Sequence, residues 1–193
     1  MLDRRLEKGH RVAMKRLLIA SVVASLAAVA SPAGAALPVG SDAPPFTTSG
    51  ALAGKDFSFD LRRALRSGPV VLYFYPKAFT QGCTLEAHAF AEVMPEFRAA
   101  GAQVLGMSAD DLPSLRRFST EECRDAFPVA IATPAIITAY DVALERNGKQ
   151  TGLTDRTSYV ISQDGRILMV HSDLDWRDHV RLTLAAVRSL KGK

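Results

Sequence analysis

The sequence predicts an α/β fold, a three-layer sandwich in which a central mixed β-sheet lies between helices. Two stretches lead to this prediction. Residues 70–108 read as strand, helix and strand, and two strands joined by a helix run parallel. Residues 157–172 read as a β-hairpin, which adds antiparallel strands. One sheet with both kinds of pairing is therefore expected.

The strand–helix–strand unit begins with the apolar run VVLYFY at residues 70–75. A continuous run of β-branched and aromatic residues is typical of a strand that is buried on both faces. Residues 80–101 form the predicted helix, with Gly101 as its C-terminal stop. Pro95 lies inside this helix and should kink or split it. The second strand is QVLGMS at residues 103–108.

Further elements flank this unit on both sides. Residues 37–49, rich in proline and other turn formers, predict an extended arm that leads into a short strand or hairpin. In the hairpin at 157–172, Asp164-Gly165 marks the turn. Four more elements follow from the apolar periodicity: a helix over 111–125, a strand over 128–132, a short helix over 134–142 and a closing amphipathic helix over 175–191. This order of elements is that of a thioredoxin-like sandwich.

Residues 1–35 have the pattern of a secretory signal peptide. The basic pair Lys15-Arg16 precedes an apolar run of 14 residues at 17–30, and Ala33-Gly34-Ala35 fits a cleavage site. The run is shorter than the roughly 20 residues that span a bilayer. An uncleaved N-terminal anchor is the alternative, and Met14 is a candidate for the true start.

Cleavage would leave one domain, residues 36–193, in the periplasm or otherwise exported, with no stable membrane association. The chain of 193 residues carries 24 basic and 20 acidic residues, a formal net charge of +4. Residues 1–35 hold six of the basic and two of the acidic residues, so 18 of each remain in the predicted domain. The excess positive charge therefore belongs to the leader and gives no support to nucleic-acid binding.

The chain contains two cysteines, Cys83 and Cys123. Taken alone, Cys83 could be half of a structural disulfide, a core residue or a reactive thiolate. Thr80 is a natural N-cap residue, which places Cys83 in the first helical turn. There the unpaired amides and the positive end of the helix dipole favour the thiolate. Gly82 leaves room for a small substrate beside the sulfur.

Pro76, Thr80 and Cys83 together form the motif Pro-x-x-x-Thr-x-x-Cys. This motif, in the stretch YFYPKAFTQGCTLEAHAF, resembles the active site of the peroxiredoxins, most closely the bacterioferritin comigratory protein (peroxiredoxin Q) group. The resemblance extends over about residues 38–191. Arg156 in DRTSYVIS matches an arginine that the family places just before a late strand.

The resemblance implies a thiol-dependent peroxidase that reduces hydrogen peroxide and organic hydroperoxides. The Cys83 thiolate would attack the peroxide and become a sulfenic acid. Arg156 and the amides around Gly82 would stabilise the developing charge, Thr80 would orient the peroxide, and Pro76 would shield the sulfur from water. The expected partner is a thioredoxin-like reductant. No cofactor and no metal are expected, and a monomer is preferred over a dimer.

The chain departs from the group's pattern at two positions. Gln81 replaces a proline that is common there, and His88 stands where many members carry the resolving cysteine. Other members use a cysteine on the next helix, which Cys123 matches. The resemblance therefore implies an intramolecular Cys83–Cys123 disulfide in the catalytic cycle. Cys123 as a plain core residue, or the same pair as a structural disulfide, remains an alternative.

For some residues, purely structural roles also remain open. Arg156 could be a surface ion-pair partner of Asp155 or Asp164, and Trp176 is expected in the core. His171 and His179 have no cluster of cysteine or acidic residues at ligand spacing, so they give weak grounds for a metal site.

Two other functions remain as alternatives. A thioredoxin-like thiol–disulfide reductase is disfavoured because position 80 is threonine and no Cys-x-x-Cys is present. The other alternative is a non-catalytic binding domain that is stabilised by one disulfide.

Overall fold

A computed structural model describes residues 36–190 of the chain. The strands are β1 (Thr47–Leu52), β2 (Lys55–Asp60), β3 (Val70–Phe74), β4 (Gln103–Ser108), β5 (Val129–Ile131), β6 (Ala143–Arg146), β7 (Lys149–Thr154), β8 (Thr157–Ile161) and β9 (Ile167–Ser172). The helices are α1 (Leu61–Leu65), α2 (Gln81–Ala99), α3 (Leu112–Glu121), α4 (Pro134–Ala139) and α5 (Arg177–Leu190).

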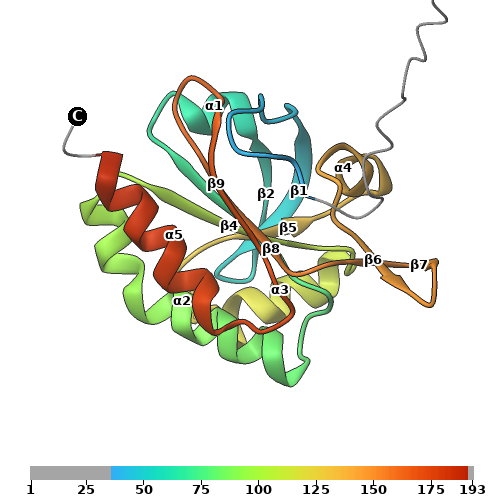
Figure 1. The fold of residues 1–193 in the computed structure, drawn as a ribbon. Coiled ribbons are helices and arrows are strands. Elements are labelled where there is room, and N and C mark those ends of the chain that lie inside the picture. The colour runs from blue at the N-terminus through green and yellow to red at the C-terminus, as the bar shows by residue number, and fades with distance from the viewer. Residues whose placement is uncertain (1–35, 191–193) are drawn as a thin grey trace, which may run out of the picture. The chain divides into compact units, whose positions relative to one another are not determined.

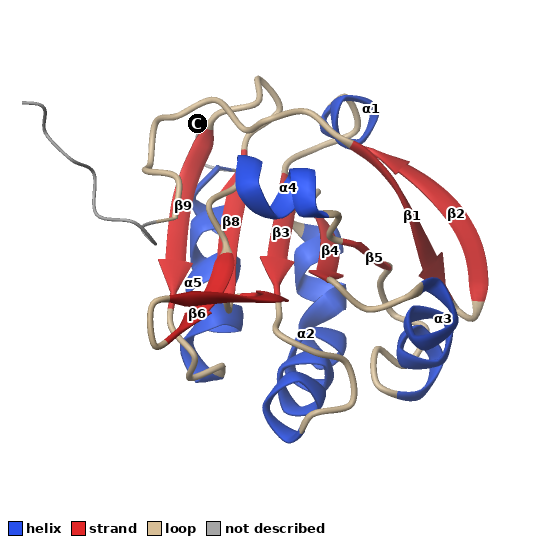
Figure 2. Cartoon of the chain, turned by 90° about the vertical axis from the view of Figure 1, so that its right-hand side faces the viewer, coloured by secondary structure: helices blue, strands red, loops and turns tan. Residues whose placement is uncertain are grey.

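Seven of these strands form one mixed sheet, the kind of sheet that was predicted, in the order β2-β1-β5-β4-β3-β8-β9, and β6 and β7 form a separate ribbon. Strand β3 pairs in parallel with β4, which pairs in parallel with β5. On its other side β3 pairs antiparallel with β8, the first strand of the predicted hairpin with β9. The sheet is seen face-on in Figure 2. Strand β3 is therefore central and has both kinds of neighbour.

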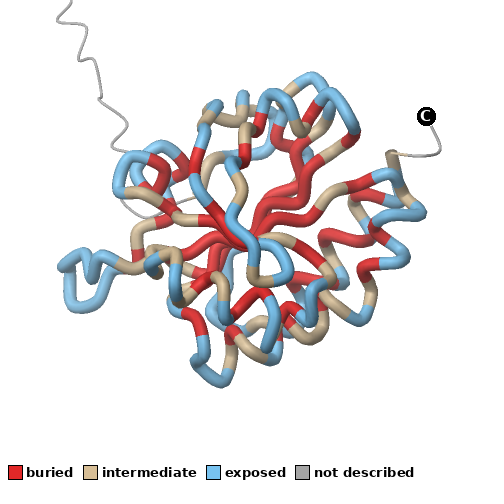
Figure 3. Tube along the Cα trace, turned by 180° about the vertical axis from the view of Figure 1, so that it is seen from behind, coloured by how far each residue is buried: buried red, intermediate tan, exposed pale blue. Residues whose placement is uncertain are grey.

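Helices cover both faces of this sheet, which gives the predicted thioredoxin-like sandwich (Figure 1). Successive side chains of a strand point to opposite faces. Val71, Tyr73 and Tyr75 accordingly join a core cluster with residues of α2, α3 and α5. Leu72 and Phe74 join a second cluster with residues of α1 and α4. Figure 3 shows that burial is concentrated in these central strands.

Helix α2 follows the prediction except at Pro95. The helix runs unbroken through this residue, so the expected split is wrong. Proline removes one amide donor there and crowds the carbonyl four residues earlier, but buried Met94 and Phe97 anchor the helix on both sides of it. Gly101 ends the helix as predicted, with a left-handed φ of +77°. Its amide donates to the carbonyl of Arg98 at 2.9 Å.

Two further features differ from the prediction. Helix α3 ends at Glu121, so Cys123 lies in the turn that follows the helix and not on the helix itself. The ribbon of β6 and β7 was not predicted. Its strands are largely exposed, so they lack the apolar alternation that identifies a half-buried strand.

No helix between residues 36 and 190 combines the length and apolar character that crossing a bilayer requires. The predicted signal peptide and its alternatives fall on residues 1–35, outside the described part of the chain.

Candidate active site

Cys83 lies in the first turn of α2, at the third helical position, as predicted. Strand β3 ends at Phe74, and Thr80 takes the extended N-cap conformation with φ −81° and ψ 148°. The Cys83 side chain is buried, with only 1% of the residue exposed. The sulfur therefore lies at the positive end of the helix dipole and is almost shielded from water.

Thr80 is the N-cap by backbone conformation only. Its side chain makes no capping hydrogen bond, and its hydroxyl donates instead to the carbonyl of Lys77 at 2.9 Å. The hydroxyl proton is therefore already used in a hydrogen bond within the loop. Its oxygen still has lone pairs that can accept a hydrogen bond.

Arg156 is brought to the sulfur from the sheet, next to the first residue of β8. Its Nη2 lies 3.5 Å from Cys83 Sγ, and its Nε donates to the carbonyl of Leu174 at 2.9 Å. Its Nη1 forms an ion pair with Glu86. The residue is only 5% exposed. These contacts fix the guanidinium plane, so one edge of it faces the sulfur.

The expected alternative for Arg156, a surface pair with Asp155 or Asp164, is wrong. The Asp155 carboxylate accepts from the Arg156 backbone amide, and Asp164 accepts from Ser162. Burial alone would lower the pKa of Arg156, but Glu86 and Cys83 outweigh this effect and raise it. The guanidinium therefore stays charged beside Cys83.

Glu86 is the residue of this site that sequence reasoning missed. Its side chain is fully buried one helical turn after Cys83, and residues three apart share a helix face. Burial raises the pKa of Glu86 to about 8, although Arg156 acts in the opposite direction. The spacing Cys-x-x-Glu is a local signal that could have identified it.

Gly82 lies against the guanidinium and the loop before α5. A β-carbon at this position would stand 3.2 Å from Arg156 Nη2 and 3.9 Å from Trp176 Cδ1. Trp176 was expected in the core, but it is only half-buried and lies at the rim of the site. Glycine therefore keeps the approach to Arg156 open.

The loop that carries Pro76 is held from strand β4. Asp110, just past the end of β4, accepts hydrogen bonds from the Ala78 amide at 2.7 Å and from the Ser108 hydroxyl at 2.8 Å. Pro76 is half-buried in this loop, and its shielding role stays a prediction. Asp110 was also missed, although a polar residue at the carboxyl end of a central parallel strand is a common functional signal.

Cys123 is a free thiol, as is Cys83, and both belong to the same core cluster. Cys123 is fully buried in the turn after α3. Burial, with smaller effects of Glu122 and Asp125, raises its pKa well above the usual range. In this arrangement Cys123 is a poor nucleophile.

Three side chains of α2 hold residues 122–126, which we call the Cys123 turn. The contacts join His88 Nε2 to Glu122 Oε2 at 2.8 Å, Glu92 to Arg124 at 3.6 Å, and Arg98 to the carbonyl oxygen of Ala126. Arg124 and Asp125 both adopt left-handed φ, of 51° and 56°. Such backbone is unfavourable for residues other than glycine, so the turn depends on contacts from outside.

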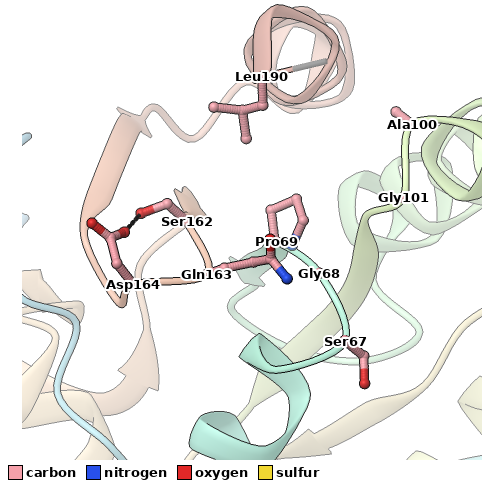
Figure 4. A pocket seen from close by; sticks show the side chains of 9 residues that line it. All are labelled: Ser67, Gly68, Pro69, Ala100, Gly101, Ser162, Gln163, Asp164 and Leu190. Atoms are coloured by element: carbon pink, nitrogen blue, oxygen red, sulfur yellow. Dashed lines mark hydrogen bonds between the residues drawn. The ribbon is translucent and has the colours of Figure 1, made fainter. Parts of the chain in front are cut away.

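A cavity with a volume of about 560 Å³ lies elsewhere in the described chain (Figure 4). Its lining includes Pro69 and Gly101. Pro69 directly precedes β3, whereas Cys83 follows the opposite end of that strand. The cavity therefore does not belong to the thiol site.

The rings of His171 and His179 contact each other at a tilt of 59°, with centroids 4.5 Å apart. His179 bonds to Ser158 and to the Asp173 carbonyl. Between residues 36 and 190, no cluster of three or more histidine, cysteine or acidic side chains is arranged to bind a metal ion.

A cysteine at a helix N-terminus, faced by a buried arginine on a thioredoxin-like sheet, defines the class of thiol-based redox enzymes. Comparisons with known proteins agree. The AhpC/TSA family matches residues 39–170. Peroxiredoxin Bcp of Xanthomonas campestris pv. campestris is 36% identical over 123 residues, covering 62% of this chain and 76% of the relative. For peroxiredoxin Bcp of Escherichia coli K12 the identity is 34% over 112 residues, covering 57% and 72%.

Solved structures agree as well. Peroxidoxin BcpB of Mycobacterium tuberculosis is 29% identical, with a TM-score of 0.71, and the match covers 80% of this chain and 98% of that one. The Xanthomonas campestris bacterioferritin comigratory protein, in a study of its alkyl peroxide reduction, is 33% identical, with a TM-score of 0.65, covering 74% and 90%. The chain belongs to the AhpC/TSA family. It is a peroxiredoxin, a thiol peroxidase that reduces peroxides with electrons from a thioredoxin-type reductant.

Proposed function

We propose that Cys83 is the peroxide-reactive cysteine of this peroxiredoxin. The observation that carries the proposal is the distance of 3.5 Å between Arg156 Nη2 and the Cys83 sulfur at the start of α2. A guanidinium and a helix N-terminus both stabilise negative charge. Together they favour the thiolate, which is the nucleophilic form of cysteine.

In the first step the Cys83 thiolate attacks one peroxide oxygen and the O–O bond breaks. The sulfur is oxidised to a sulfenic acid, and the other oxygen leaves with the bonding electron pair as hydroxide or alkoxide, which takes a proton. Arg156 and the amides near Gly82 face this developing charge. Thr80, whose proton is donated to Lys77, accepts the hydrogen bond of the peroxide and orients it. Pro76 limits the access of water.

The second step is resolution by Cys123. Its thiol attacks the Cys83 sulfenic acid, a disulfide forms and water leaves. Cys123 is buried and held by α2 in the reduced protein, so the Cys123 turn must leave α2 before the two sulfurs meet. Release also exposes the thiol to water, which removes the burial that suppresses its ionisation.

The substrate class includes organic hydroperoxides. Support comes from the Xanthomonas relative, whose structures were solved in a study of alkyl peroxide reduction. The enzyme acts outside the cytoplasm as a monomer, and a thioredoxin-like protein of that compartment reduces its disulfide. The leader pattern at residues 1–35 supports this location. The mass of the N-terminal peptide from the secreted or periplasmic fraction tests it, and a chain that retains residues 1–35 contradicts cleavage.

The reaction is tested by intact mass of the reduced protein after one equivalent of hydrogen peroxide. We expect the wild type to lose two hydrogens, Cys123→Ser to gain oxygen, and Cys83→Ser to stay unchanged. If Cys123→Ser gains no oxygen and forms no mixed disulfide, Cys83 is inert and the proposal fails. If the wild type gains oxygen without losing two hydrogens, Cys123 is not the resolving residue.

A further inference from the structure

Thr154 is a fully buried polar residue that the peroxidase steps above do not use. It is the last residue of β7, two positions before Arg156, and it is 0% exposed. Its hydroxyl donates to the carbonyl oxygen of Tyr75 at 2.6 Å, although the two residues lie 79 positions apart. A buried hydrogen bond between distant segments restrains their relative position.

The two segments that this bond joins carry the two groups of the active site. Tyr75 directly precedes Pro76, and the chain continues from there through the loop to Cys83 at the start of α2. Thr154 directly precedes the two residues that lead into β8, and the second of them is Arg156. The Thr154 hydroxyl therefore connects the base of the cysteine loop to the segment that carries the arginine.

This contact lies just past the end of a strand ladder. Strands β3 and β8 pair directly as far as Phe74 and Thr157. One residue beyond that pair, the amide of Tyr75 donates to the carbonyl of Met107 at 2.9 Å, and its carbonyl accepts from Thr154. The peptide groups of Tyr75 are thus held from both sides, by β4 and by the end of β7.

The other contacts of Arg156 hold the tip of its side chain. Nη1 pairs with Glu86, which lies on α2 like Cys83, and Nε donates to the carbonyl of Leu174. These contacts orient the guanidinium, but they start from wherever the backbone places the residue. Nη2 lies 3.5 Å from the sulfur, so a shift of that backbone changes a contact that is already at its limit.

We propose that Thr154 is a positioning residue of the peroxidase reaction, and that its hydrogen bond to Tyr75 keeps Arg156 aligned with Cys83. The hydroxyl touches neither the sulfur nor the peroxide and acts through Arg156. The inference rests on the proposed function, in which Arg156 stabilises the thiolate and the leaving oxygen.

Loss of the hydroxyl would leave the Tyr75 carbonyl buried without its donor. Such a group is unfavourable, so the end of β3 and the end of β7 would move until the carbonyl found another donor or water. A misplacement of about 1 Å at a reacting group can slow a reaction by about 100-fold. A partial displacement of Arg156 should therefore be visible in the rate of Cys83 oxidation.

The test is the second-order rate constant of Cys83 oxidation by hydrogen peroxide, measured against pH. Thr154→Val keeps the branched shape and removes the hydroxyl. We expect its rate to fall at least about fivefold, and its pH profile to move to higher pH because the thiolate is less well stabilised. Thr154→Ser keeps the hydroxyl and should restore both the rate and the profile. Thr154→Ala removes the hydroxyl and serves if the valine variant does not fold.

Thr157→Val is the matched control. Thr157 is 1% exposed and directly follows Arg156, but its hydroxyl pairs with that of Ser172 at 2.8 Å, between β8 and β9. The substitution removes an equally buried hydroxyl beside the arginine without touching the cysteine loop. We expect it to follow the wild type in rate and in pH profile.

The shift of the profile reports on Arg156 because the variants keep every other group that acts on the sulfur. The titratable and charged groups that face Cys83 are Glu86 on the same helix, Tyr73 on β3, Tyr75 after it, and Arg156. A role of Thr154 in stability alone would lower the unfolding midpoint and leave the profile of the folded enzyme in place.

A Thr154→Val protein with the wild-type rate and profile would overturn the inference. So would a Thr154→Ser protein that is as slow as the valine variant, or a Thr157→Val protein with the same loss. Ultraviolet absorbance of the thiolate, in a Cys123→Ser background with Cys83→Ser as the blank, gives the profile without peroxide. If wild-type Cys83 fails to react with peroxide, the proposed function fails, and the absorbance of Thr154→Val still decides whether Thr154 positions Arg156.

Discussion

His88 should act as a brake on disulfide formation, because it holds the Cys123 turn against α2. His88 Nε2 lies 2.8 Å from Glu122 Oε2, and the two side chains are 30% and 20% exposed. Pairs with such exposure typically contribute about 0.2–1 kcal/mol. His88→Leu removes this contact from the closed arrangement, where Cys123 is buried. The open arrangement, in which Cys123 can reach Cys83, does not contain the contact and is not affected.

The expected effect follows from a rapid opening equilibrium. If opening precedes attack of Cys123 on the sulfenic acid, the observed rate is proportional to the open population. A loss of about 0.2–1 kcal/mol from the closed state increases that population by roughly 1.4- to fivefold. The step in which peroxide oxidises Cys83 should keep its rate, because His88 does not contact Arg156 or the sulfur.

Rapid-mixing fluorescence separates the two steps, since oxidation depends on peroxide concentration and disulfide formation does not. Quenched samples analysed by mass spectrometry give the same two rates. Arg188→Leu is the matched control. Arg188 on α5 forms an exposed ion pair with Glu96 on α2, away from the Cys123 turn, and the substitution breaks this pair. A His88→Leu protein whose disulfide forms at the wild-type rate would refute the brake, and a slower rate would mean that His88 guides the turn toward Cys83.

Three further outcomes are expected. Arg156→Lys should lower the rate of peroxide reduction by about 10- to 100-fold, because lysine cannot contact the thiolate and Glu86 in one plane; a loss below threefold in stopped-flow assays would contradict this role. Gly106→Ala should destabilise the fold by about 1–3 kcal/mol in urea unfolding, since the new β-carbon would stand 2.8 Å from the Tyr73 ring, and an unchanged midpoint would be inconsistent with that contact. Burial lowers the pKa of His179 from its usual 6.5 to about 4, so the unfolded chain binds the proton first and stability falls as the pH drops from about 6.5 to about 4, by about 3 kcal/mol in total. His179→Gln should flatten this part of the stability profile, and a profile parallel to the wild type would show that another group is responsible.

The parts of the fold that could be predicted from the sequence are those with strong local patterns. The run at 70–75, the periodic helix from Thr80 to Gly101 and the Asp164-Gly165 turn all lie where they were expected. The position of Cys83 in the first helical turn follows from Thr80 in the same way. Each of these predictions needs only neighbours along the chain.

The parts that were missed depend on contacts between distant residues. Arg156 and Glu86 lie 70 positions apart, and charged side chains are seldom fully buried, so the local Cys-x-x-Glu spacing marks Glu86 but does not predict its partner. Helix α3 was predicted too long because no glycine or proline ends it. Its end is set by the Cys123 turn, which α2 holds from the side. The β6–β7 ribbon did carry one unused signal, the turn dipeptide Asn147-Gly148.

Helix α2 connects the two steps of the proposed cycle. Its first turn presents Cys83 to Arg156, and its side holds the turn that carries Cys123. The contact of the first turn with Arg156 favours the Cys83 thiolate. The contacts along the side of the helix delay the attack of Cys123 on the oxidised Cys83. Cys83 is only 1% exposed, so an added oxygen has little room in the closed arrangement, and in the proposed cycle it favours release of the Cys123 turn. In the proposed cycle Cys123 stays protonated and covered while Cys83 is reduced, and it becomes available when Cys83 has been oxidised. Premature pairing of the two thiols is limited by the same helix that makes one of them reactive.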